Sequence, residues 1–210
     1  MQNEERQTLD AISAAGEIAL ITIEPSEGQI TRLATLLKKG CFVRVRTGCS
    51  MRELLCEQFN ISPEYVRKDI KVLFLDFSPV DDIDSAIIKD GSIIALSAAM
   101  PGLVGAAMRK DGLSWMRSSI TYHETAGEHV CQDGLIHMKL FNQVMVDLGE
   151  SFLRRGVYVK SRFLADFLGR FDGAFWRECR KISRNGDAMT ENDLLETLQG
   201  RDEWVRFTIR

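Results

Sequence analysis

Short apolar runs and helix-start signals alternate between residues 41 and 97, and this order constrains the fold more than any other feature of the sequence. Ser50-Met51-Arg52-Glu53 is a capping box, which predicts that a helix begins there. Asp90-Gly91 is typical of a tight turn that leads into a strand. The apolar runs are short and rich in β-branched residues, so they indicate strands rather than buried helices. The predicted order is a strand at 41–46, a helix at 50–59, a helical turn at 62–64, and strands at 71–75 and 92–97.

The rest of the chain adds helices and strands on both sides of this stretch. Each helix follows from an apolar face of helical period, and each strand from a short run that stops at a turn residue. We expect the strands that follow the central stretch to extend its sheet. The additional predicted elements are helices at 3–15, 27–39, 142–154, 161–171 and 175–183, a helix capped at Thr190, and strands at 17–24, 114–124, 135–141 and 204–209.

These elements predict an α+β fold in three parts. The first is an N-terminal helix–strand–helix extension, residues 1–40. The second is the compact module of residues 41–102, and the third is a C-terminal α+β part, residues 103–210, with two strands followed by helices. A mixed sheet crossed by one helix is the expected core of the module.

Composition excludes several classes of protein. The chain of 210 residues has 45% hydrophobic residues and a net charge of −3, which is typical of a globular protein. Without a basic excess it is a poor candidate for binding nucleic acid. It lacks the apolar run of roughly 20 residues that spans a membrane, and an acidic N-terminus without a signal-type run predicts a soluble, cytoplasmic protein. The five cysteines show no CxxC spacing, so we expect free thiols in a reducing compartment.

Five segments of the module are similar to one family. They are residues 50–55 (SMRELL), 72–75 (VLFL), 79–82 (PVDD), 89–96 (KDGSIIAL) and 100–102 (MPG). In order and spacing, residues 41–102 resemble the sulfur-carrier branch of the β-grasp (ubiquitin-like) superfamily. This branch includes the small subunit of molybdopterin synthase and the thiamine sulfur carrier. The resemblance implies a β-grasp fold for this module.

The chain departs from that family in two ways. A sulfur carrier works through the free carboxylate of a terminal glycine, which is adenylated and then converted to a thiocarboxylate. Here Gly102 follows a proline rather than a glycine, and the chain continues after it, so the carrier reaction would need cleavage after Gly102. The family's first hairpin joins two strands by a short turn. In this chain a predicted helix separates the strands at 17–24 and 41–46, so we expect the opening strand to pair differently.

One segment gathers potential metal ligands. All three histidines lie in it, and imidazole and thiolate are good zinc ligands. Its spacing matches no established zinc pattern, so the alternatives are a solvated acidic loop or a catalytic role for one histidine. Cys131 beside His129 resembles a nucleophile with its base, but no motif supplies an oxyanion hole or an orienting group. The candidate metal ligands are His123, His129, Cys131 and His137. Zinc is the one cofactor that these ligand types suggest.

A glycine-rich segment follows the module. Pro101, Gly102 and Gly105 begin a stretch that has neither the P-loop nor the dinucleotide-binding pattern. We interpret it as a crossover between the two sheet-containing parts, where a pocket or a partner surface could form. Basic residues such as Arg52 and Arg67 are interleaved with acidic ones, which is typical of a solvated face.

The sequence thus favours a non-catalytic binding or scaffold protein that docks a protein partner through a β-grasp surface or a sheet edge. Two alternatives remain open. One is a sulfur-carrier-type precursor cleaved after Gly102, and the other is a metal-binding protein or metalloenzyme that uses the His123–His137 loop. Whether the chain is an enzyme is not decided by any motif, although the absence of a catalytic constellation argues against it. We expect neither a nucleic-acid nor a membrane partner, and the sequence sets no oligomeric state.

Overall fold

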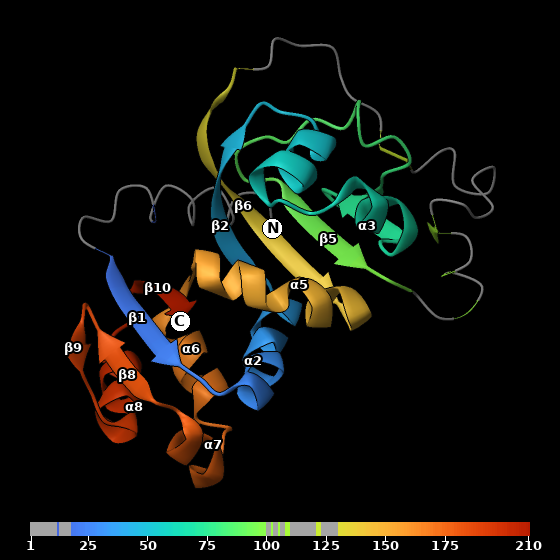
Figure 1. The fold of residues 1–210 in the computed structure, drawn as a ribbon. Coiled ribbons are helices and arrows are strands. Elements are labelled where there is room, and N and C mark those ends of the chain that lie inside the picture. The colour runs from blue at the N-terminus through green and yellow to red at the C-terminus, as the bar shows by residue number, and fades with distance from the viewer. Residues whose placement is uncertain are drawn as a thin grey trace. The chain divides into compact units, whose positions relative to one another are not determined.

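A computed structural model describes residues 12, 18–99, 102, 105, 108–109, 121–122 and 130–210 (Figure 1). These residues combine helices with strands, in agreement with the predicted mixture of α and β structure. They form two compact units. The first unit comprises Met1–Phe42 and Leu148–Arg210, and the second comprises Val43–Asp147. Among the described helices, none is both long and apolar enough to cross a bilayer.

The first unit combines an N-terminal and a C-terminal segment of the chain. Its strand order is β7–β10–β1–β8–β9, and Phe42 of β2 pairs with Tyr158 of β7. β1 runs parallel to β10, with Ile21 opposite Phe207, and both side chains are fully buried. The elements are β1 (Ala19–Glu24), α2 (Glu27–Ala34), the 3-10 helix η1 (Thr35–Lys38), the start of β2 (Cys41–Thr47), most of α5 (Asn142–Arg155), β7 (Val157–Lys160), α6 (Ser161–Leu168), α7 (Gly173–Glu178), β8 (Lys181–Arg184), β9 (Asp187–Ala188), α8 (Glu191–Gln199) and β10 (Trp204–Ile209).

The second unit has a five-stranded sheet in the order β4–β3–β5–β6–β2. β3 is antiparallel to both β4 and β5, whereas β5 runs parallel to β6. Thr47, at the end of β2, bonds through its Oγ1 to the backbone oxygen of Gln132, at the start of β6, so these two strands are antiparallel. The elements are β2 from Val43 on, the π-helix η2 (Glu53–Gln58), α3 (Pro63–Lys68), β3 (Val72–Leu75), β4 (Ser78–Pro79), β5 (Ile93–Ser97), β6 (Gln132–Phe141) and the start of α5.

Two short helices lie in front of this sheet in Figure 1. η2 buries Leu54 and Leu55, and α3 buries Val66, so each helix contributes apolar side chains to the core. In η2 the N–H of Phe59 donates to the oxygen of Leu54 at 3.0 Å, which is the i to i+5 bond of a π-helix. The side-chain amide of Gln58 accepts a hydrogen bond from the N–H of Arg46 and donates one to its carbonyl oxygen. Both backbone groups of this residue of β2 therefore have partners.

Most of the predicted elements are confirmed. The strands expected at 17–24, 41–46, 71–75, 92–97, 135–141 and 204–209 are present, as are the helices at 27–39, 50–59, 142–154 and 161–171 and the one capped at Thr190. The predicted sharing of one sheet is also confirmed, because β6 pairs with β5. The predicted helix at 3–15, apart from a buried, helical Ile12, lies outside the described residues, and so does the strand at 114–124 apart from Thr121 and Tyr122.

The helix predicted at 175–183 is wrong after Glu178. The compact units of the structure also have other bounds than the three predicted parts. The helix expected at 175–183 ends at Glu178, because Lys181–Arg184 instead pairs antiparallel with β1 and turns at Asn185-Gly186 into β9. The three predicted parts do not coincide with the two compact units. Pairing of β1 with β10 joins the N-terminal extension to the C-terminal part, and pairing of β5 with β6 carries the second unit beyond residue 102.

Candidate functional site

The predicted metal ligands are only partly described. His123 and His129 lie outside the described residues. Cys131 is exposed immediately before β6, and His137 is half-buried on β6, opposite Ile93 of β5. Residues six apart on an extended chain are separated by about 20 Å, so Cys131 and His137 do not bind one ion together. Within the described part of the chain, no three His, Cys, Asp or Glu side chains are arranged to bind a metal ion.

The predicted pocket or partner residues are also only partly described. Pro101 lies outside the described residues. Gly102 is exposed, with a φ of +77°, and a Cβ there would have no neighbour within 4 Å. Gly105 is buried. No described residue therefore approaches Gly102, and it does not line the pocket described next.

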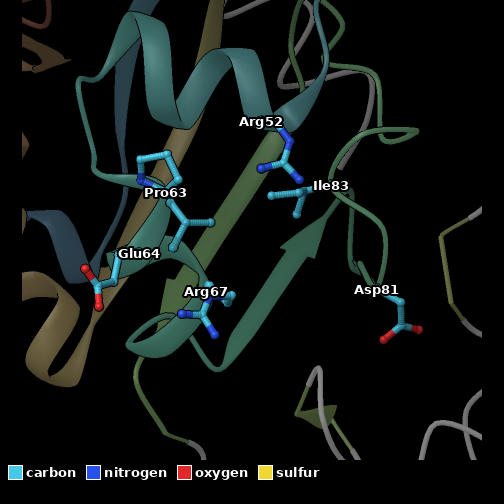
Figure 2. A pocket seen from close by; sticks show the side chains of 7 residues that line it. Arg52, Pro63, Glu64, Arg67, Asp81 and Ile83 are labelled. Carbon is cyan, nitrogen blue, oxygen red and sulfur yellow. The ribbon is translucent and has the colours of Figure 1, made fainter.

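A pocket of about 510 Å³ opens in the second unit between η2, α3 and the loop that follows β4 (Figure 2). Its apolar lining is Pro63, Val66 and Ile83. In Figure 2, Arg52 lies beside Ile83, and Arg67 lies across the hollow from Arg52. Four charged residues complete the lining: Arg52, Glu64, Arg67 and Asp81.

Backbone hydrogen bonds fix one wall of this pocket. The first N–H groups of a helix have no partner within the helix, so they need acceptors elsewhere. Here the N–H of Arg52 donates to Ile83 O at 3.0 Å, and that of Met51 donates to Ala86 O at 2.8 Å. Two further bonds join residue 88 to residues 48 and 49. The loop and the start of η2 therefore form one rigid wall.

The opposite wall is α3, whose position follows from its own sequence. Ser62 Oγ accepts a hydrogen bond from the N–H of Tyr65 at 3.1 Å, and Pro63 occupies the first helical position, where no N–H is needed. The hydroxyl of Tyr65 donates to Asp147 Oδ2 at 2.7 Å and thereby fixes α3 to the start of α5. Burial and this hydrogen bond both raise the pKa of Tyr65, so the bond persists at neutral pH.

The charges around the pocket are not equally neutralised. Arg52 binds Asp84 in a bidentate pair, with Nη2 at 2.8 Å from Oδ2. Hydrogen bonding within this pair raises the pKa of Arg52 and lowers that of Asp84. Glu64 is paired with Lys68 one turn along α3. Arg67, in contrast, makes no ion pair with any residue that the structure describes.

The charged groups of the pocket are spread around its apolar lining. Figure 2 shows the carboxylates of Glu64 and Asp81 at opposite ends of the hollow, directed away from its centre. Among the described lining residues there is no cysteine, histidine or hydroxyl side chain that could act as a nucleophile. An uncompensated guanidinium beside an apolar floor can instead bind a carboxylate whose neighbouring group is apolar.

Sequence reasoning missed this pocket, although it found the helix starts that build both walls. The capping box at Ser50 and the Ser62-Pro63 pair were visible, and Arg52 and Arg67 were interpreted as part of a solvated face. The missing information was the path of the chain between Val80 and Ile88, because only that loop brings Ile83 and Asp81 to the two helices.

Comparison with known proteins gives no relative for this chain: no family model, no curated protein and no solved structure matches it.

Proposed function

We propose that this protein is a non-catalytic binding or scaffold protein whose second unit docks a short segment of a partner protein. The segment carries an aspartate or glutamate that pairs with Arg67 and an apolar side chain that packs on Pro63 and Ile83. Arg67 lines this pocket and forms no ion pair with a described residue, which is the observation that carries the proposal. Burying even part of an apolar side chain adds roughly 1–2 kcal/mol to such an ion pair.

Pre-organisation supports the choice of this pocket. Binding costs the freedom of every side chain that must be ordered, so walls that are already fixed bind more tightly. The loop wall is bonded through its backbone to the start of η2, and α3 is capped and bonded to Asp147. The outer edge of the second unit's sheet is less suitable for docking a strand, because β4 has only two residues.

We also propose that the second unit is a rearranged β-grasp module. In the family, the strand before the helix belongs to a hairpin formed with the preceding strand. Here β2 precedes η2 and has β6 as its antiparallel neighbour, so we propose that β6 takes the place of that first strand. Cleavage after Gly102 would cut the covalent connection between β5 and β6, which are neighbours in one sheet. This disfavours the carrier alternative, in which residues 41–102 act alone.

The test is selection from a displayed library of random ten-residue peptides on the immobilised full chain, followed by calorimetric titration of the selected peptides. We expect peptides with an Asp or Glu close to a Leu, Ile or Phe. Arg67→Glu is expected to weaken their binding at least tenfold, because it replaces an attraction by a repulsion.

Arg177→Glu in the first unit is the matched control, because Arg177 is an exposed helical arginine that lines a different pocket. It should leave the affinity unchanged. Equal binding to wild type and Arg67→Glu would overturn the proposal, as would loss of binding in the control only. A natural protein whose C-terminus is Gly102, identified by intact mass, would instead favour the carrier.

A further inference from the structure

Two cysteines lie at the junction of β2 and β6 in the second unit. Gly48 has a φ of +77°, and a Cβ there would collide with the backbone oxygen of Val130 and lie 3.0 Å from the N atom of Cys131. One residue earlier, Thr47 Oγ1 lies 3.1 Å from Gln132 O. The backbone after β2 therefore runs directly against the backbone before β6. Cys49 and Cys131 belong to these two touching segments.

The two thiols differ in their surroundings. Cys131 is exposed, whereas Cys49 is half-buried and donates to Arg46 O at 3.2 Å. Gln58 Nε2 donates to Cys49 Sγ at 3.2 Å. Burial is the largest cause that raises the pKa of Cys49, and Glu53 and Cys131 raise it further. Cys131 is therefore the more accessible thiol for a first reaction with a small molecule.

We propose that Cys49 and Cys131 form a thiol-oxidation site that reacts with a low-molecular-weight disulfide such as oxidised glutathione and closes to an intramolecular disulfide. The exposed Cys131 thiolate attacks one sulfur of glutathione disulfide, and the first glutathione leaves as a thiolate. The Cys49 thiolate then attacks Sγ of Cys131 and displaces the second glutathione. The two protein thiols are oxidised, one glutathione disulfide is reduced, and the two thiol protons end on two glutathione molecules.

The bond would connect elements that are distant in sequence. It would tie the residue before the capping box of η2 to the residue before β6 and close a loop that contains η2, α3, β3, β4 and β5. Disulfides that close long loops restrict the unfolded chain most, so oxidation is expected to raise the melting temperature. The backbone of Cys49 also binds Ile88, in the loop wall of the pocket. The inference does not depend on the proposed docking function.

The experiment incubates the reduced full chain with oxidised glutathione at pH 8 and follows intact mass and non-reducing peptide maps. The wild type should lose the mass of two hydrogen atoms and give a linked Cys49–Cys131 peptide. Cys49→Ser should stop at the first step and accumulate glutathione on Cys131. Cys56→Ser, a half-buried cysteine in η2, should behave as the wild type.

Higher pH should accelerate ring closure, because Cys49, whose pKa is raised by burial, must ionise before it attacks. The proposal fails if the wild type accumulates the same stable Cys131–glutathione adduct as Cys49→Ser, or if the linked peptide contains other cysteines. Cys131→Ser is a second variant that removes the disulfide. It changes an exposed side chain, so it is not expected to disturb folding. It should show no linked peptide and an unaltered melting temperature in the reduced state.

Discussion

The two units each contain a pocket, and the two pockets differ in charge and in construction. One pocket of the first unit, about 630 Å³, is lined by Arg177, Arg180 and Lys181, with Glu191 as its acidic residue. It lies at the short elements α7 and β9. The pocket of the second unit is lined by two arginines and two carboxylates, and its walls are fixed by backbone hydrogen bonds and a capped helix. If the second unit docks a partner as proposed, fixed walls matter more than an excess of cations, because they reduce the entropy lost on binding.

The units also differ in how the chain builds them. The first unit pairs the first described strand with the last, whereas the second is one continuous stretch of chain. Each is expected to respond to damage in its own core. The predictions that follow change matched positions in the two units, in order of decreasing effect.

The largest effect is expected from the cores. Phe207→Ala in β10 and Leu140→Ala in β6 each remove a fully buried side chain, which costs about 3–5 kcal/mol of unfolding free energy. Hydrogen exchange should show lost protection in β1 and β7 for the first variant and in β5 for the second, because these are the paired strands. Equal loss in β1 and β5 for either variant would contradict the division into two units.

A smaller effect is expected from two glycines with positive φ. Gly48→Ala in the second unit introduces a methyl group against the backbone of Val130 and should cost roughly 2–3 kcal/mol. Gly186→Ala in the first unit meets nothing within 4 Å, so only the left-handed backbone opposes it, at about 1 kcal/mol. Urea denaturation measures both. Equal costs would show that the close approach of Gly48 to Val130 does not matter.

Helix caps offer a comparison of the pocket walls. Ser62→Ala and Thr190→Ala each remove a side-chain acceptor from a helix N-terminus, at about 1 kcal/mol of unfolding free energy. Only Ser62 caps a wall of the proposed docking pocket. Calorimetry should therefore show weaker binding of the selected peptides to Ser62→Ala and unchanged binding to Thr190→Ala. The reverse pattern would place docking in the first unit.

The smallest effect concerns one carboxylate. Arg52 holds the pKa of Asp84 below its ordinary value, so the pair is formed at neutral pH and is lost as pH falls through that lowered pKa. Arg52→Gln should return the pKa of Asp84 upward to the ordinary range, as measured by carboxylate chemical shifts during an acid titration. Because the pair is exposed, the melting temperature should change little. An unaltered pKa would show that the pair does not form in solution.

Local signals made most of the fold predictable. The capping box at Ser50, the Ser62-Pro63 start and the Thr190 cap act within one helical turn, and the structure contains all three helices. The β8–β9 turn had a local signal too, in Asn185-Gly186, but the apolar residues from Phe175 onward were interpreted as one longer helix. Ile182 is the only β-branched residue in β8, so composition alone did not reveal the change of structure after Glu178.

The sequence predicted that later strands extend the sheet, but it did not predict the order of the strands. β6 lies between β5 and β2, and β1 lies beside β10, yet no residue of these strands specifies its partner. The candidate site depends on the same kind of information. Arg52, Arg67 and Ile83 become neighbours only through the path of the loop after β4, and the Gly48 contact appears only once β2 and β6 are paired.

The central claim is that the second unit docks an acidic partner segment at Arg67. Amide chemical-shift mapping of the full chain during titration with a selected peptide tests it most directly. The account predicts that the largest shifts fall on α3, on residues 80–86 and on the start of η2. Largest shifts on residues 176–192 of the first unit, or shifts of the same size in Arg67→Glu, would contradict it.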